Sequence, residues 1–197
     1  MAITTGILLF EDAEELDFVG PWEVFTMARA GHEDDRVVTI AERPGPVRAA
    51  KGLRVLPDHS FADAPPLDVV LVPGGQGTRK EVDNPVLLDW LRRSAERCTW
   101  VTSVCTGSYL LHRAGLAKGR RVTTHWAFCE TLRQQGEVEV VEHVRYVRDG
   151  KLVTAAGVSA GIDMALWLVG QIHGVEHARR TQRFMEYDPA PPYTADV

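Results

Sequence analysis

The sequence predicts a three-layer α/β sandwich, flavodoxin-like in arrangement, with a mainly parallel central sheet flanked by helices. Short apolar runs alternate with longer helical patterns along the whole chain, as in folds that connect parallel strands through helices. Several runs are apolar throughout, which is typical of strands buried on both faces. The 197 residues, 45% of them apolar, suffice for one core, so we expect a single domain over residues 1–197.

The first half of the chain contains three apolar runs and two helical patterns. Gly20-Pro21 predicts the start of a helix, because proline favours the first helical position. Asn84, followed by Pro85, predicts a second helix whose first turn donates to the asparagine side chain. The expected elements are strands over 6–10, 36–40 and 68–72, a hairpin over 47–56, and helices over 22–30 and 84–97.

The second half repeats the alternation and adds a hairpin. Asp149-Gly150 lies between two alternating runs and predicts a tight turn. The helical pattern over 160–173 is nearly all apolar, so we expect this helix to be buried. The Pro-rich segment 189–193 cannot continue a helix. The expected elements are strands over 99–104 and 121–124, a hairpin over 146–153, and helices over 106–115, 126–135, 160–173 and 175–187.

Charge and composition exclude several classes of partner. The net charge is -5 and the sequence pI is about 5.8. A mildly acidic chain without a basic block is poorly suited to nucleic acid or to an anionic membrane. We find no secretory signal and no apolar run that could cross a bilayer, and the 3 cysteines are too irregularly spaced for a disulfide framework. We therefore expect a reduced, cytoplasmic protein.

Cys105 stands where a predicted strand runs directly into a helix. Gly107 follows two residues later, which gives the segment the form of a nucleophile elbow with cysteine in place of serine. So tight a turn predicts strained backbone at the nucleophile and places the sulfur above a helix N-terminus, which stabilises a thiolate. We expect Cys105 to be functional. Cys98 and Cys129, which end or lie within helices, are expected to be structural.

Three further segments could contribute to a site at the carboxyl ends of the strands. Gly74-Gly75 ends one strand, and paired glycines let backbone N–H groups face a cavity, as an oxyanion hole requires. Asp17 lies between apolar neighbours in the loop after the first strand, where it could share a proton with a thiol or cap the next helix. His125 follows another strand and could be a base, a pocket wall or an ordinary buried histidine.

The histidines form no pattern of metal ligands. His173 and His177 lie four residues apart but straddle Gly174, and His112 and His143 are isolated in the sequence. We predict no metal and no organic cofactor.

These segments, in this order, resemble the ThiJ/PfpI superfamily of class I glutamine amidotransferase-like proteins, and within it the isonitrile (isocyanide) hydratases. The likeness covers nearly the whole chain. The elbow and the Gly74-Gly75 turn mark the superfamily, whereas segments 16–21 and 186–193 are the more specific matches. Superfamily proteases carry histidine after the nucleophile, where this chain has Thr106. Superfamily regulators add a helix-turn-helix module, for which we expect no room here.

The resemblance implies hydration of an isonitrile to an N-substituted formamide. Cys105 would attack the terminal carbon while the nitrogen side is protonated, and water would hydrolyse the resulting thioimidate. Asp17 would transfer the protons, Thr106 would orient substrate or water, and the N–H groups of Gly75 and Thr106 would stabilise negative charge. A small apolar electrophilic substrate implies an apolar pocket. Its expected walls are Phe18, His125, Trp126 and Phe128. The resemblance also implies a homodimer.

Two alternatives stay open from the sequence. The same cysteine could serve another reaction, such as hydration of an α-oxoaldehyde or hydrolysis of an amide, or it could be modified in a non-enzymatic small-molecule or redox sensor. The chain also departs from the hydratases, because Ala155-Ala156 replaces glycines and only four residues follow Tyr193. The first change could reshape the pocket, and the second could alter the dimer interface.

Overall fold

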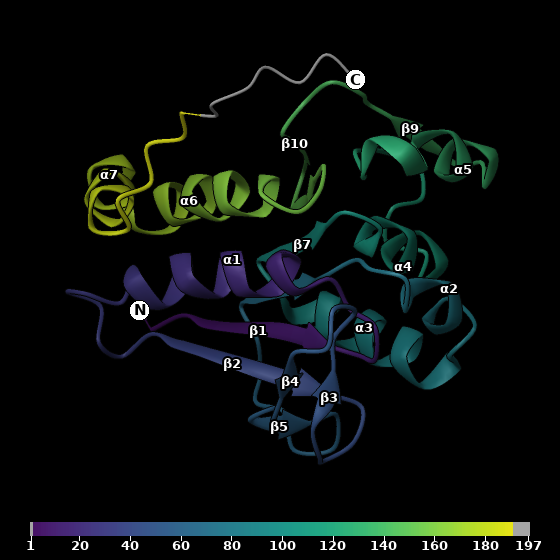
Figure 1. The fold of residues 1–197 in the computed structure, drawn as a ribbon, viewed down its shortest axis with the longest axis horizontal. Helices are drawn as coiled ribbons and strands as arrows, with labels where there is room; N and C mark the ends of the chain where they lie inside the picture. Colours follow the sequence, from purple (N-terminus) through teal and green to yellow (C-terminus); the bar gives the residue numbers. More distant parts are fainter. Residues whose placement is uncertain (1, 191–197) are drawn as a thin grey trace.

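The computed structural model describes residues 2–190, which form a seven-stranded sheet between helices (Figure 1). The strands of this sheet are β1 (Thr4–Leu9), β2 (Arg36–Ala41), β5 (His59–Ser60), β6 (Val69–Val72), β7 (Trp100–Val104), β10 (Tyr146–Asp149) and β11 (Leu152–Ala155). Their order is β10-β11-β7-β6-β1-β2-β5, and only β10 and β11 pair antiparallel. The predicted fold class is confirmed.

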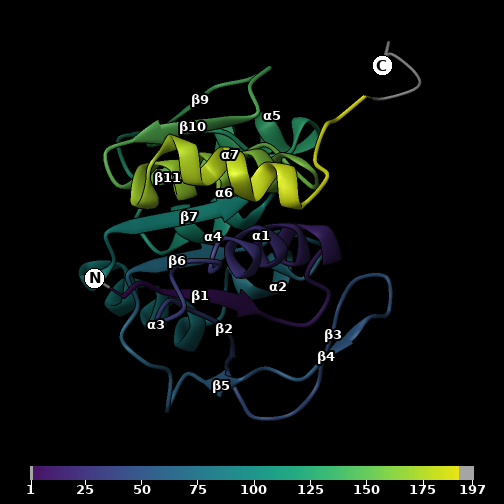
Figure 2. The ribbon, with the colours of Figure 1, turned by 90° about the vertical axis from the view of Figure 1, so that its left-hand side faces the viewer.

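Helices cover both faces of the sheet, as the alternating pattern predicts. The helices of one layer are α1 (Glu15–Met27), α6 (Ala160–His173) and α7 (Val175–Phe184), and those of the other include α3 (Pro85–Arg97) and α4 (Gly107–Arg113) (Figure 2). The remaining helices are α2 (Thr78–Glu81), η1 (Trp126–Phe128) and α5 (Cys129–Gln134). Two small sheets are formed by β3 (Val47–Arg48) with β4 (Arg54–Val55), and by β8 (Arg120–Val122) with β9 (Val138–Val140).

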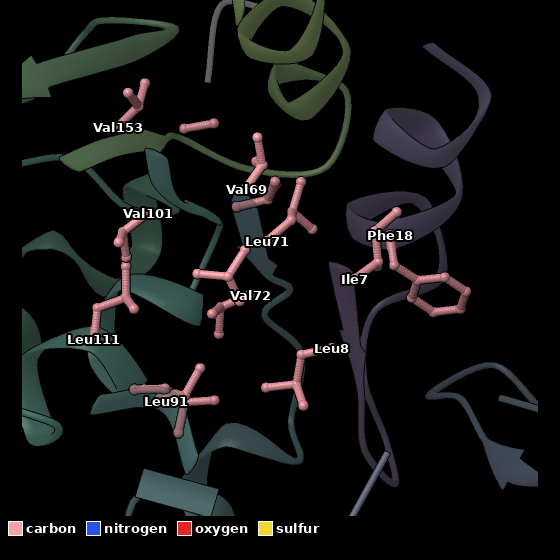
Figure 3. Close-up of a cluster of buried hydrophobic side chains, with 14 of the residues drawn as sticks. Ile7, Leu8, Phe18, Val69, Leu71, Val72, Leu91, Val101, Leu111 and Val153 are labelled. Atoms are coloured by element: carbon pink, nitrogen blue, oxygen red, sulfur yellow. The ribbon is translucent and has the colours of Figure 1, made fainter. Parts of the chain in front are cut away.

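The core lies on both faces of the central strands. Ile7 and Leu8 are consecutive in β1, so their side chains point to opposite faces, and both are fully buried. Phe18 of α1 and Leu91 of α3 belong to the same apolar cluster (Figure 3). The unbroken apolar pattern of this strand therefore follows from the two helical layers that cover it.

The cap predicted for α3 is present. The Asn84 side chain accepts hydrogen bonds from the N–H groups of Val86 (3.1 Å) and Leu87 (3.3 Å). The hairpin predicted at Asp149-Gly150 is also confirmed, with Gly150 at a φ of 62° in the turn between β10 and β11.

The prediction for the first helix is wrong at its start. Helix α1 begins at Glu15, not near Trp22, and Pro21 lies inside it. Proline usually excludes helical backbone from the residue before it, but the steric conflict is smallest when that residue is glycine, as Gly20 is. A Cβ on Gly20 would lie 2.9 Å from Cγ1 of Ile162, so this glycine also lets α1 and α6 approach closely.

The predictions after residue 120 need smaller corrections. The strand expected over 121–124 is β8, which pairs with the unpredicted β9 outside the main sheet. The helix expected over 126–135 is divided into η1 and α5, and the last helix ends at Phe184 rather than near 187. Residues 191–193 of the Pro-rich segment lie outside the described residues. No helix within residues 2–190 has the length and apolar character needed to span a membrane.

Candidate active site

Cys105 lies at the junction of β7 and α4 with backbone in the left-handed region. Its φ is 55°, so the predicted strain at the elbow is present. The Cys105 N–H donates to the carbonyl of Ala155 (3.1 Å). The Cys105 carbonyl accepts hydrogen bonds from Oγ1 of Thr124 (2.9 Å) and Oγ of Ser108 (3.0 Å). Hydrogen bonds to β11 and to the segment after β8 therefore hold the strained residue in place.

Two glycines leave the space in which the elbow turns. A Cβ on Gly107 would lie 2.1 Å from the carbonyl oxygen of Val72. A Cβ on Gly74 would lie 2.5 Å from the Thr106 nitrogen and 2.8 Å from the Cys105 Cβ. Helix α4 therefore packs on the end of β6 with no room for side chains at these positions.

We predict that Gly107→Ala destabilises the protein by about 1–3 kcal/mol, because the new methyl group must displace backbone rather than a flexible side chain. The matched change Gly170→Ala, inside α6, places its Cβ at an ordinary 3.6 Å from Ala178. It should stabilise by about 0.5–1 kcal/mol, since alanine favours a helix interior. Urea unfolding of both variants measures the difference, and equal midpoints would contradict the steric argument.

Asp17 is fully buried beside the elbow. Its Oδ2 accepts the N–H of Gly74 (2.8 Å), and its Oδ1 accepts the N–H of Val158 (3.0 Å). Val158 has a φ of 48°, which is unusual for a β-branched residue. Asp17 lies in the first turn of α1. It does not cap that helix, because the cap position is Glu14.

Asp17 and Cys105 form a coupled pair of acids. Burial raises the pKa of Asp17 to about 7, although hydrogen bonds from Gly74 and Val158 and the nearby Cys105 thiol oppose this shift. Burial, reinforced by the charge of Asp17, raises the pKa of the Cys105 thiol to about 12. Desolvation thus opposes the stabilisation of a thiolate that the sequence predicts at the N-terminus of α4. Near neutral pH the thiol keeps its proton and Asp17 is about half protonated, so the pair holds between one and two protons.

Thr106 follows Cys105 in the elbow, and its N–H and hydroxyl groups lower the pKa of the Cys105 thiol against the larger effect of burial. Oγ1 of Thr106 accepts the N–H of Gly75 (3.1 Å). The Gly75 N–H therefore orients the Thr106 hydroxyl, and Gly75 itself lines a cavity beside the sulfur. The stabilisation of negative charge by the N–H groups of Gly75 and Thr106 stays a prediction.

A cavity of about 260 Å³ opens beside the sulfur. Its lining residues are Glu14, Ala50, Gly75, Gln76, Arg79, Cys105, Thr106, His125, Ala127, Phe128 and Val158. His125 and Phe128 therefore lie where the sequence predicts pocket walls. Phe18 does not, because it is 4% exposed and packs in the core. Trp126 is 77% exposed and lines a neighbouring groove instead.

Several cavity residues have no local signal in the sequence. Arg79 follows the Gly-Gly turn on the short helix α2, and its Nη1 donates to Oγ1 of Thr106 (3.3 Å). Val158 reaches Asp17 from a position 141 residues away in the chain. Neither contact can be inferred from a motif, because each depends on the packing of distant segments.

The other two cysteines lie away from this cavity. The Cys98 thiol donates to the carbonyl of Leu67 (3.4 Å), and burial raises its pKa to about 12. Cys129 is buried in α5, where burial also raises the pKa of its thiol.

The closely spaced histidines form a cluster at the other side of the fold. His173 Nε2 lies 2.8 Å from Oδ2 of Asp35, and His177 Nε2 lies 2.6 Å from the carbonyl oxygen of Ala28. No group of three or more His, Cys, Asp or Glu side chains within residues 2–190 is arranged to hold a metal ion.

An open parallel sheet with a cysteine at the nucleophile elbow and a buried acid beside it defines the structural class. The chain belongs to the DJ-1/PfpI family, whose sequence model matches residues 5–171. The family match spans both residues of the acid–thiol pair.

Individual relatives and structures agree with this assignment. The chain is 42% identical over 193 residues to an isonitrile hydratase of Pseudomonas putida, covering 98% of this chain and 82% of that protein. It is 27% identical over 168 residues to a glutathione-independent glyoxalase of Caenorhabditis elegans, covering 84% of this chain and 86% of that one. A ThiJ/PfpI family protein from Pseudomonas syringae superimposes with a TM-score of 0.92 at 31% identity, covering 100% of this chain and 80% of its own.

Proposed function

We propose that this protein is a cysteine-dependent hydratase that converts an isonitrile and water to an N-substituted formamide. The observation that carries the proposal is the buried Asp17–Cys105 pair, which retains a proton at neutral pH next to a small cavity. The 42% identity to an isonitrile hydratase over nearly the whole chain supports this choice of reaction.

The first chemical step is addition of the Cys105 thiol to the terminal carbon of the isonitrile. Asp17 takes the thiol proton, the sulfur forms a bond to the carbon, and Asp17 returns the proton to the same carbon. The product is a thioimidate, R–N=CH–S–Cys105, in which all atoms of the isonitrile and the thiol are retained. In this proposal the hydroxyl and N–H groups of Thr106, the residue after Cys105, stabilise negative charge that develops on the adduct.

The second step is hydrolysis of the thioimidate. Water adds to the C=N carbon while the nitrogen gains a proton, giving a tetrahedral adduct. Its C–S bond then breaks, and the products are R–NH–CHO and the free Cys105 thiol. In this proposal Asp17 removes a proton from water and returns one to the departing sulfur, a role that suits a carboxyl group whose pKa of about 7 is close to the working pH.

The same geometry weighs against a redox sensor. Oxidation of cysteine by a solute requires an accessible sulfur, and Cys105 is only 8% exposed. Turnover with internal proton transfer suits this environment better than direct oxidation by a solute.

We further propose that the chain acts as a cytoplasmic homodimer with no nucleic-acid or membrane partner and no cofactor. The net charge of -5 and the family resemblance support this. Val19 and Trp22 on α1 are 38% and 39% exposed, which offers an apolar surface to a second copy. Sedimentation equilibrium measures the association, and a monomer at micromolar concentration would contradict it.

The experiment that tests the function follows the absorbance of an aryl isonitrile during incubation with the purified protein. Methylglyoxal and a simple amide are assayed in parallel, because a glyoxalase is also among the relatives. We expect catalytic formation of the formamide with many turnovers per Cys105. Turnover of methylglyoxal or the amide, without turnover of the isonitrile, would overturn the proposal.

A further inference from the structure

Arg79 reaches the mouth of the active-site cavity from α2 and is fixed there through one terminal nitrogen. Its Nη1 donates to the carbonyl of Gly75 (2.9 Å), Oγ1 of Thr78 (3.0 Å) and Oγ1 of Thr106 (3.3 Å). The guanidinium carbon lies 4.8 Å from the centre of the Phe128 ring, which is a cation–π contact. Although Arg79 is exposed as a residue, these contacts hold its guanidinium in one orientation.

The other edge of this guanidinium is open. Within residues 2–190, Nε and Nη2 of Arg79 make no hydrogen bond and Arg79 forms no ion pair. Two adjacent N–H groups of a planar guanidinium match the two oxygens of a carboxylate. The acidic residue in the cavity lining, Glu14, already forms an ion pair with Lys51. The cavity therefore contains one oriented cation without a counter-charge.

We propose that Arg79 binds a carboxylate on the substrate, so that this protein acts on isonitriles whose N-substituent carries an anionic group. The proposal rests on the isonitrile hydration proposed above, and it narrows the substrate class of the same site. Because the group C≡N–R is linear, the substituent extends away from the Cys105 sulfur, and Arg79 is an exposed residue of the lining of the same cavity. The ion pair then forms in a partly solvated position, which avoids the desolvation cost of a fully buried pair.

The first test needs no isonitrile. Iodoacetate and iodoacetamide both alkylate a cysteine sulfur with loss of iodide, and they differ in that only iodoacetate carries a carboxylate. The rate of Cys105 alkylation by each reagent is measured by mass spectrometry of the Cys105 peptide. We expect the ratio of the iodoacetate rate to the iodoacetamide rate to fall about 10-fold in Arg79→Gln. This factor corresponds to the free energy of one charge-assisted hydrogen bond.

The control variants separate binding from other effects. Arg79→Lys keeps the charge and should retain part of the ratio, although lysine cannot bind both carboxylate oxygens. Lys80→Gln removes the same charge from the neighbouring, exposed position on α2 and should leave the ratio unchanged. Equal slowing with both reagents in Arg79→Gln would mean that Arg79 acts only on the thiol. Equal falls of the rate ratio in Arg79→Gln and Lys80→Gln would mean that both residues act through the general positive potential of α2 rather than through a contact. Either result overturns the proposal.

The second test compares isocyanoacetate, whose carboxylate lies at a distance from the sulfur closer to that in iodoacetate, with its methyl ester as substrates. We expect the wild type to prefer the carboxylate by about 10-fold in kcat/KM and Arg79→Gln to lose this preference through KM. A lost preference caused by equal falls in kcat for both substrates would overturn the proposal. If the wild type hydrates neither compound, the proposed function fails, whereas the alkylation ratio still reports on the carboxylate site.

Discussion

Replacing Cys105 with alanine is expected to lower isonitrile hydration by at least about 1,000-fold, because the variant has no atom that can form the thioimidate. The oriented donors at Thr106 remain, but they stabilise charge on an adduct that no longer forms. Formamide production by purified Cys105→Ala, measured beside the wild type under the same conditions, tests this directly.

Two further variants make the result specific to the sulfur at this position. Cys98→Ala removes another buried thiol that lies outside the cavity lining, and should leave kcat/KM near the wild-type value. Cys105→Ser keeps a hydrogen-bonding group in the same strained backbone but should be nearly inactive, since a serine hydroxyl is a much weaker nucleophile. The folded state of each variant is checked by near-ultraviolet circular dichroism. Residual activity above a few per cent in Cys105→Ala would remove Cys105 from its proposed role.

The sequence reveals the elbow because its signals are local. An apolar strand, a cysteine and Gly107 all lie within eight residues (Trp100–Gly107), and each has one steric interpretation at a strand-to-helix junction. The structure agrees in detail, since Cys105 has a positive φ and Gly107 has no room for a Cβ. The fold class is predictable for a similar reason, because burial on both faces produces the apolar runs 6–9 of β1 and 69–72 of β6.

Side-chain direction at the site could not be predicted in the same way. Phe18 adjoins Asp17 in the sequence, and if both lay in a loop either could face the cavity. Because Asp17 lies in α1 instead, the next residue is turned by about 100° around the helix axis, and Phe18 enters the core. The sequence misplaces the helix start because Gly20-Pro21 is a strong start signal, whereas the conflict of proline with helical backbone before it is smaller when that residue is glycine.

Long-range contacts define the remainder of the site. The N–H groups of Gly74 and Val158 reach Asp17 across 57 and 141 residues of chain, and no pattern within one segment predicts such pairs. The same holds for the direction of the thiol pKa. A helix N-terminus predicts a lowered pKa, whereas the burial of Cys105 by its surroundings raises it.

Asp17→Asn is expected to lower kcat/KM by about 100- to 10,000-fold, the usual contribution of a positioned proton-transfer group. The pH dependence of kcat/KM shows whether the loss of activity comes from the loss of the titrating carboxyl group. Burial raises the pKa of Asp17 to about 7, so the pair gains a second, inhibitory proton as the pH falls below that value. Wild-type kcat/KM should therefore rise with pH through about 7 and then level off, and Asp17→Asn should lose this inflection.

Glu14→Gln provides a matched control for the inflection. The negative charge of Glu14 contributes to raising the pKa of Asp17, so its removal should move the midpoint of the wild-type profile to lower pH while the plateau changes less. An Asp17→Asn profile that keeps its midpoint near that of the wild type would assign the titration to another group.

The free energy of unfolding should fall as the pH rises, whereas kcat/KM should rise, and Asp17 is the cause of both dependences. A carboxyl group whose pKa is raised on folding, as the pKa of Asp17 is by burial, binds more protons in the folded state, so the wild type loses stability as the pH rises from the ordinary aspartate value toward the raised one. Asp17→Asn removes this dependence. It also places an amide N–H₂ against the N–H of Gly74 or Val158, which both donate to Asp17, and this mismatch should cost about 1–3 kcal/mol. Urea unfolding at several pH values separates the two effects: the deficit of the variant should shrink as the pH rises, because only the wild type then carries a buried charge.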